Sequence, residues 1–221
     1  MNTRSRGRAV LTAVITAVVL IAGLVGPDSA TAQAASRSGH MPAADQAARA
    51  AATNLKLVSP LNAKGHLRHR YTVDSIHSGY CWTTSAVNGH LYRCFMGNYV
   101  MDPCWKESGR HSVVCLTQPW STKVTRLRLT KALPSQDGYG PSIWGLRLGG
   151  GVGVDCQVSM GASGTVGKHP ISYFCQHGWV LLGNHPDRSQ PLWTMLTAKQ
   201  VGNHYDLRGR KPLRVAWKAV R

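Results

Sequence analysis

Histidine is the residue type in this chain that is best suited to acid–base chemistry, and ten are present. A metal-free ribonuclease uses two histidines and a lysine to transfer protons while it cleaves a polyanion. Nine of the histidines follow residue 60, spread evenly and mostly in polar segments. Solvated surface positions are the simplest interpretation of such residues. Hydrolysis of a polyanion, as by a metal-free ribonuclease of this kind, is therefore the alternative function and not the first one.

The carboxylates and serines of the chain give a weaker indication of catalysis than the histidines do. The chain has nine acidic residues, with Glu107 the single glutamate, and pairs such as Asp102-Pro103 and Asp137-Gly138 are typical of turns. A glycosidase needs two carboxylates flanking one bond, and no such pair is indicated. The sequence lacks the Gly-x-Ser-x-Gly elbow of serine hydrolases. No catalytic, cofactor-binding or metal-ligating residue is predicted.

Cysteine predicts structure instead of chemistry. The six cysteines show no Cys-x-x-Cys spacing, which argues against a zinc site. An even number in an exported chain indicates disulfides, although six cysteines allow 15 pairings. We predict sequential pairing, which closes three short loops, each stabilising the fold by about 3 kcal/mol. The predicted bonds are Cys81–Cys94, Cys104–Cys115 and Cys156–Cys175.

The amino-terminal segment predicts export. Arg4, Arg6 and Arg8 precede an uncharged apolar run over residues 9–26, which small residues follow. This order is typical of a secretory signal peptide over residues 1–32, with cleavage before Gln33 or Ala35. The alternative is a retained membrane anchor, because 18 residues are at the lower limit of a bilayer span. The predicted location is extracellular or at the cell wall.

The charge favours anionic partners. Removing residues 1–32 leaves 23 basic and eight acidic residues, a net charge of about +15. Such a surface attracts polyanions, which outside a cell include wall polymers, lipid headgroups, acidic polysaccharide and nucleic acid. A protein partner, or a charge that only maintains solubility, remains as an alternative.

The chain divides into an Ala-rich flexible tether over residues 33–69 and a β domain over residues 70–221. Turn pairs such as Gly97-Asn98 and Gly202-Asn203 separate short runs in which apolar residues alternate with polar ones. The apolar positions of three such runs are Leu127 and Leu129; Trp144, Leu146 and Leu148; and Leu213, Val215 and Trp217. Short strands at this spacing predict an all-β sandwich or barrel.

Basic residues occupy the outward positions in and around two of these runs. If the two strands are neighbours, the residues form one patch for an anionic polymer, bound through many salt-sensitive contacts. Two ordinary solvated strand faces are the alternative. The candidate patch is Arg126, Arg128, Lys131, Arg208, Arg210, Lys211, Arg214 and Lys218.

Two cysteine regions resemble each other and indicate a duplication. Cys81 precedes Trp120 by 39 positions, and Cys156 precedes Trp193 by 37. We therefore hypothesise two half-domains of β-hairpins, over residues 70–134 and 141–221, in which Cys81–Cys94 and Cys156–Cys175 are equivalent bonds. Chance similarity between Gly- and Thr-rich strands is the alternative.

Tryptophan is a candidate for carbohydrate contact. Trp82 and Trp105 adjoin cysteines, where packing in the core is expected. Trp120, Trp179 and Trp193 are the better candidates for exposed rings, although packing in the core is the first expectation for each of them.

Several short motifs resemble those of small exported proteins of high-GC Gram-positive bacteria. The likeness covers residues 72–219 and implies export and a disulfide-bonded domain, without supplying catalytic or binding residues. The motifs are Gly79-Tyr80-Cys81-Trp82-Thr83, Tyr92-Arg93-Cys94, Asp102-Pro103-Cys104, Val113-Val114-Cys115, Leu127-Arg128-Leu129-Thr130 and Val215-Ala216-Trp217. The sequence therefore predicts an exported basic binding domain without catalysis.

Overall fold

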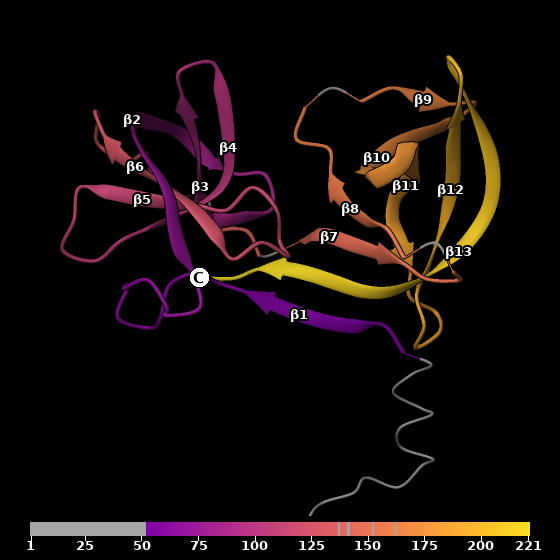
Figure 1. Ribbon diagram of the computed structural model, residues 1–221, viewed down its shortest axis with the longest axis horizontal. Helices are drawn as coiled ribbons and strands as arrows, with labels where there is room; N and C mark the ends of the chain where they lie inside the picture. Colours follow the sequence, from indigo (N-terminus) through magenta and orange to yellow (C-terminus); the bar gives the residue numbers. More distant parts are fainter. Residues whose placement is uncertain (1–51, 137, 141, 152, 162) are drawn as a thin grey trace, which may run out of the picture. The chain divides into compact units, whose positions relative to one another are not determined.

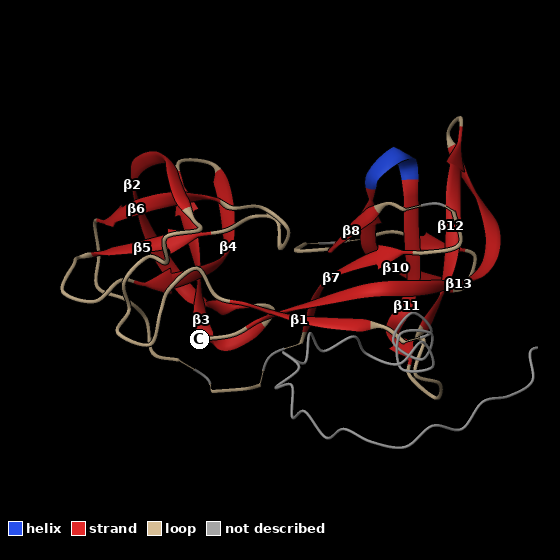
Figure 2. Cartoon of the chain, turned by 60° about the horizontal axis from the view of Figure 1, so that its bottom comes forward, coloured by secondary structure: helices blue, strands red, loops and turns tan. Residues whose placement is uncertain are grey.

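The computed structural model describes residues 52–136, 138–140, 142–151, 153–161 and 163–221. Within this part the chain is almost entirely β-structure, with one short 3₁₀ turn and no α-helix (Figure 2). The all-β prediction is therefore confirmed. The predicted signal peptide and residues 33–51 of the predicted tether lie outside the described residues. In the described part, no helix is long and apolar enough to cross a membrane.

Five consecutive strands form a closed barrel, which we call barrel one (Figure 1). Each pairs antiparallel with the next, and the fifth returns to pair in parallel with the first. The predicted Gly97-Asn98 turn is the two-residue connection of one hairpin. The strands are β2 (Thr72–Ser85), β3 (Asn88–Met96), β4 (Tyr99–Lys106), β5 (Ser112–Cys115) and β6 (Lys123–Leu129).

Six strands form a second closed circuit, barrel two, in which every neighbouring pair is antiparallel, including the closing pair of β13 and β7. The short β9 (Thr165–Val166) pairs with β10 outside this circuit, and the 3₁₀ turn Gln176–Gly178 precedes β11. The strands of barrel two are β7 (Ile143–Leu148), β8 (Asp155–Val158), β10 (His169–Cys175), β11 (Trp179–Asp187), β12 (Thr194–Val201) and β13 (His204–Ala219).

The predicted tether is corrected in its last part, where Asn54–Val58 forms strand β1. This strand pairs in parallel with the end of β13, from Asn54 opposite Val215 to Val58 opposite Ala219. Its side chains are mostly exposed, and Leu57 is 60% exposed. Backbone hydrogen bonds, not an apolar stripe, hold β1, so a pattern search based on hydropathy has nothing to detect.

The end of β13 contributes side chains to two separate cores. Leu213 and Ala216 lie in the interior of barrel two, whereas Val215 and Trp217 lie in a cluster shared with barrel one. The alternation had predicted one face for Leu213, Val215 and Trp217. A register shift between Leu213 and Val215 changes the phase, because an extra residue in one strand moves the following side chains to the opposite face.

We call this shared cluster the junction cluster, and it receives residues from both barrels and from β1. Trp105 of β4 and Trp144 of β7 meet in it with ring centroids 6.2 Å apart. Its buried members are Val58, Leu61, Tyr71, Val87, Leu91, Trp105, Val114, Leu116, Val124, Trp144, Val215, Trp217 and Ala219.

The three disulfides pair sequentially, as predicted. Each joins directly opposed residues of one antiparallel strand pair: β2 with β3, β4 with β5, and β8 with β10. The Sγ atoms of Cys94, Cys104 and Cys115 lie within 4.8 Å of one another. All three belong to disulfides, so they offer no thiolate to a metal ion.

The two predicted halves, 70–134 and 141–221, each contain one barrel, but the barrels are not equivalent strand by strand. Cys81–Cys94 joins the first and second strands of barrel one, whereas Cys156–Cys175 joins the second and third of barrel two. Barrel one has five strands in its circuit and barrel two has six. The two barrels therefore differ in strand number, and the duplication of β-hairpins stays a hypothesis.

Candidate anion-binding cleft

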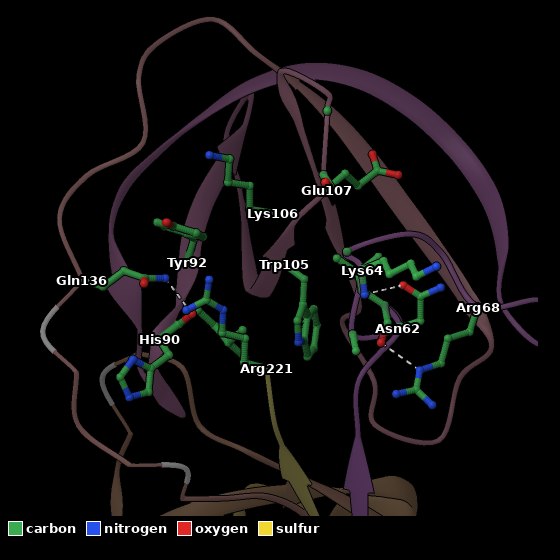
Figure 3. A pocket seen from close by; sticks show the side chains of 16 residues that line it. Asn62, Lys64, Arg68, His90, Tyr92, Trp105, Lys106, Glu107, Gln136 and Arg221 are labelled. Atoms are coloured by element: carbon green, nitrogen blue, oxygen red, sulfur yellow. Dashed lines mark hydrogen bonds between the residues drawn. The ribbon is translucent and has the colours of Figure 1, made fainter.

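A cleft of about 800 Å³ opens beside the beginning of β3 and the end of β4 (Figure 3). One side is the loop of residues 61–68 that leads from β1 toward β2, and the other comes from residues 90–92 and 105–109. Gln136 and Arg221 complete the lining, and Gln136 Nε2 donates to the carbonyl of His90 at 2.6 Å.

Hydrogen bonds within the loop hold its shape. Asn62 Oδ1 accepts from the backbone N–H groups of Lys64 and His66 at 2.9 and 3.0 Å. Arg68 Nε donates to the carbonyl of Leu61 at 2.8 Å. Gly65 has a φ of 76°, and a Cβ there would lie 2.9 Å from the Cβ of Ser108. The loop therefore needs glycine where it docks on the turn after β4.

Trp105 lies at the centre of the cleft in Figure 3 and ties it to the carboxyl end of β13. Its ring is buried, and its Nε1 donates to the carbonyl of Val220 at 2.6 Å. Tyr92 lies nearby. Burial raises the pKa of its hydroxyl and the charge of Arg221 opposes the shift, so Tyr92 remains a neutral hydrogen-bond donor.

Glu107 is the one acidic residue in the lining, and its charge is neutralised inside the protein. Arg126 of β6 donates from Nε to Glu107 Oε2 at 2.8 Å and from Nη2 to Oε1 at 2.7 Å, and Ser112 Oγ donates to Oε2 at 2.6 Å. Burial favours the neutral acid, but these hydrogen bonds outweigh it and hold the pKa of Glu107 below its usual range. Glu107 thus stays ionised without making the cleft acidic.

Four basic side chains in the lining give the cleft a positive charge. Lys64, Arg68, Lys106 and Arg221 are all exposed, and none forms an ion pair within the described residues. Figure 3 shows them around Trp105, with Lys64 and Arg68 on the loop and Lys106 and Arg221 across from it. The arrangement is suited to a ligand that carries several negative charges.

The first part of the predicted basic patch lies on barrel one. Arg126 is bound to Glu107 and has only 19% of its side chain exposed. Arg128 is exposed on β6, and Lys131 lies with Nζ 4.3 Å from the centre of the Tyr80 ring.

The second part lies on and beside barrel two. Arg208 pairs with Asp206 at 3.4 Å and Arg210 with Asp187 at 3.6 Å. The remaining members are Lys211, Arg214 and Lys218 on β13. The strand β6 pairs with β2 and β5, whereas β13 pairs with β1, β7 and β12. The two strands are not neighbours, so the condition for one continuous patch is not met.

One tryptophan differs from expectation. Trp82 was assigned to the core but is 39% exposed, whereas Trp105 is buried as expected. Trp120 is half-buried against Trp217, and Trp179 and Trp193 are also half-buried. The cysteine beside Trp82 faces the interior, and the neighbouring side chain of a strand points to the opposite face.

Sequence reasoning missed the cleft because its cations come from separate segments. The one available signal was the density of basic residues over positions 64–70, of which residues 64–69 had been assigned to the tether. His90 is the single histidine in the lining, so the cleft does not bring together the two histidines expected of a ribonuclease. Comparisons with protein-family models, curated proteins and solved structures give no match.

Proposed function

We propose that this chain is an exported protein whose cleft binds an anionic polymer of the cell envelope or the extracellular medium. The observation that carries the proposal is the set of four cations around Trp105 that form no ion pair within the described residues, in a cleft whose single acidic side chain is bound by Arg126. Three disulfides support an oxidising location, because they persist outside the reducing cytosol.

The proposal is binding without catalysis. General acid–base cleavage of a polyanion needs two groups that exchange protons with opposite sides of the scissile bond. His90 has no second histidine beside it in the lining, and Glu107 is held by Arg126 and Ser112. Cations and neutral donors such as Tyr92 bind anions without changing them.

Salt-dependent affinity tests the proposal. The oxidised protein is titrated with heparin and with an anionic wall polymer over a series of salt concentrations. The cleft variant Lys64→Ala/Lys106→Ala removes two cations that contact the ligand, so the slope of log K against log salt falls by about 2.

The matched control is Lys56→Ala/Lys168→Ala, which removes two exposed lysines from β1 and from the β9–β10 turn, outside the cleft lining. The control keeps the slope of the unmodified protein. Equal losses in the two double variants would mean that net charge alone attracts the polymer, and would refute a dedicated site. Cleavage of either polymer would refute binding without catalysis.

A further inference from the structure

A second surface of barrel one carries one exposed and two half-buried aromatic rings on adjacent strands. Trp82 of β2 stacks on Phe95 of β3 with ring centroids 4.0 Å apart and planes 21° apart. Tyr80 of β2 lies directly opposite Phe95, with centroids 5.6 Å apart. We call these three rings the aromatic strip. Val100 of β4, which is 46% exposed, lies opposite Phe95 on the same face.

A shallow basic hollow of about 260 Å³ lies at the other end of the same face of β2. Its lining is Ile76, Arg110, His111, Ser112, Arg126 and Arg128. The strand register joins it to the aromatic strip, because Ile76 pairs with Arg126, Ser78 with Arg128 and Tyr80 with Phe95. Residues 76 to 82 of an extended strand span roughly 20 Å, a length that several nucleotides cover.

The unpaired charges around this face are positive. Arg110, Arg128 and Lys131 form no ion pair within the described residues. Asp102 is buried in a bond to Arg93 at 2.6 Å, and Asp74 pairs with Lys123 at 3.1 Å. The face therefore presents cations at one end, rings at the other, and no free acid among the residues named here.

We infer that this face binds single-stranded nucleic acid, with phosphates in the basic hollow and bases on the aromatic strip. A polymer whose charge is its only feature gains from the hollow but gains nothing from the exposed Trp82 ring and the rings beside it. Nucleic acid supplies both features, since every nucleotide has a phosphate and a flat base that stacks on aromatic side chains. The strip is held by paired strands, so little conformational entropy is lost when a base docks.

This surface has a different lining from the cleft, although Arg126 of the hollow binds Glu107 of the cleft lining. The cleft uses residues 90–92 at the beginning of β3, whereas the aromatic strip uses Phe95 near its end. The inference therefore does not rest on the proposed function, and each can fail while the other holds.

The experiment measures the affinity of the full oxidised protein for two fluorescent probes of twelve nucleotides and equal charge. One probe is oligothymidylate, and the other is its abasic analogue. We expect the abasic probe to bind about 10-fold more weakly, because it cannot stack. Trp82→Ala should weaken oligothymidylate binding by about the same factor and leave the abasic probe unchanged. Trp82→Phe should restore most of the affinity.

Phe174→Ala is the matched control, since Phe174 is an exposed ring on β10 of barrel two. It should leave both affinities unchanged. Arg128→Gln should lower the salt slope for both probes by about 1. Lys64→Ala/Lys106→Ala in the cleft should preserve the difference between the probes.

Equal affinity for the two probes, or the same affinity with and without Trp82, overturns the inference. Heparin binding that depends on Trp82 while oligothymidylate binding does not would also overturn it, and would identify an acidic polysaccharide as the occupant. Circular dichroism of Trp82→Ala confirms that the variant is folded, as expected for a residue that is 39% exposed.

Discussion

One barrel has an odd number of strands and the other an even number, and this difference determines whether the closing strand pair is parallel or antiparallel. In a succession of antiparallel strands, neighbours alternate in direction, so a barrel of six ends with its last strand antiparallel to its first. A barrel of five ends with the two strands parallel. Barrel two closes antiparallel through β13 and β7, and barrel one closes parallel through β6 and β2.

The interiors differ as well. The interior cluster of barrel one contains four cysteines in two disulfides, together with Met101, Val113 and Leu127. The interior of barrel two holds one disulfide and larger apolar residues such as Leu146, Tyr173 and Met195. Burial raises the pKa of the Tyr173 hydroxyl to about 12, consistent with its place in this apolar interior. Barrel one thus depends more on covalent cross-links, and barrel two more on apolar packing.

The strongest test of this comparison removes the disulfides of each barrel. Replacing all four cysteines of barrel one by alanine should lower the free energy of unfolding by about 6 kcal/mol, and Cys156→Ala/Cys175→Ala by about 3 kcal/mol. Urea unfolding measures the loss, and hydrogen exchange locates it. We expect β2–β6 to lose protection in the first variant while β10–β12 keep theirs. Equal losses, or simultaneous loss of protection in both barrels, would mean that they fold as one unit.

A second test asks whether β13 serves both barrels. Trp217→Ala should destabilise the protein by about 3–5 kcal/mol, because the ring is buried in the junction cluster. The amide groups of β5 and β6 should lose protection, although Trp217 belongs to a strand of barrel two. Leu213→Ala is the control, expected to cost about 2–5 kcal/mol in barrel two alone. Indistinguishable exchange patterns for the two variants would contradict the division of β13 between two cores.

The smallest expected change in stability comes from a test that compares one ion pair in each barrel. Because the pKa of Glu107 is lowered in the folded state, its stabilisation is present above about pH 4.3 and is lost as the pH falls further. Glu107→Gln should therefore reduce stability near pH 7 by about 1–3 kcal/mol, and the difference should shrink as the pH falls through the lowered pKa of Glu107.

The counterpart in barrel two is Asp155, which Arg147 binds at 2.6 Å with 40% of the arginine side chain exposed. Asp155→Asn should have a smaller effect at pH 7, because solvent weakens an exposed ion pair. Thermal unfolding from pH 3 to 7 measures both variants. A larger loss for Asp155→Asn would reverse the ranking of the two pairs.

Local features of the fold could be predicted because they depend on neighbours in the sequence. The cysteine pairs connect adjacent strands, and two-residue turns lie where Gly97-Asn98 and Gly202-Asn203 indicate them. The alternation of Leu127 with Arg128 predicted the correct faces for both. The phase at Val215 and the exposure of Trp82 were predicted incorrectly. A register shift near Val215 lies where simple alternation ceases to apply, whereas Trp82 is exposed because its neighbour Cys81 faces the interior.

The candidate site could not be predicted in the same way. Lys64, Lys106 and Arg221 become neighbours only when the loop docks on the turn after β4 and the end of β13 reaches barrel one. No local sequence pattern identifies such residues, because the sequence around an exposed lysine is the same kind of polar segment whether the lysine lies in a cleft or on a flat face. The nearest signal was the basic density over positions 64–70.

By itself, then, the sequence determined an all-β chain, its disulfide pairing and the positions of several turns. It also determined the excess of positive charge that motivates both binding proposals. Only the tertiary structure decided the number of strands in each barrel, the pairing of β1 with β13, and the separation of the basic residues into a cleft and a hollow. The physical reason is that barrel closure and β1 pairing rest on backbone hydrogen bonds between distant strands, which every residue except proline can donate, so side-chain patterns do not record them.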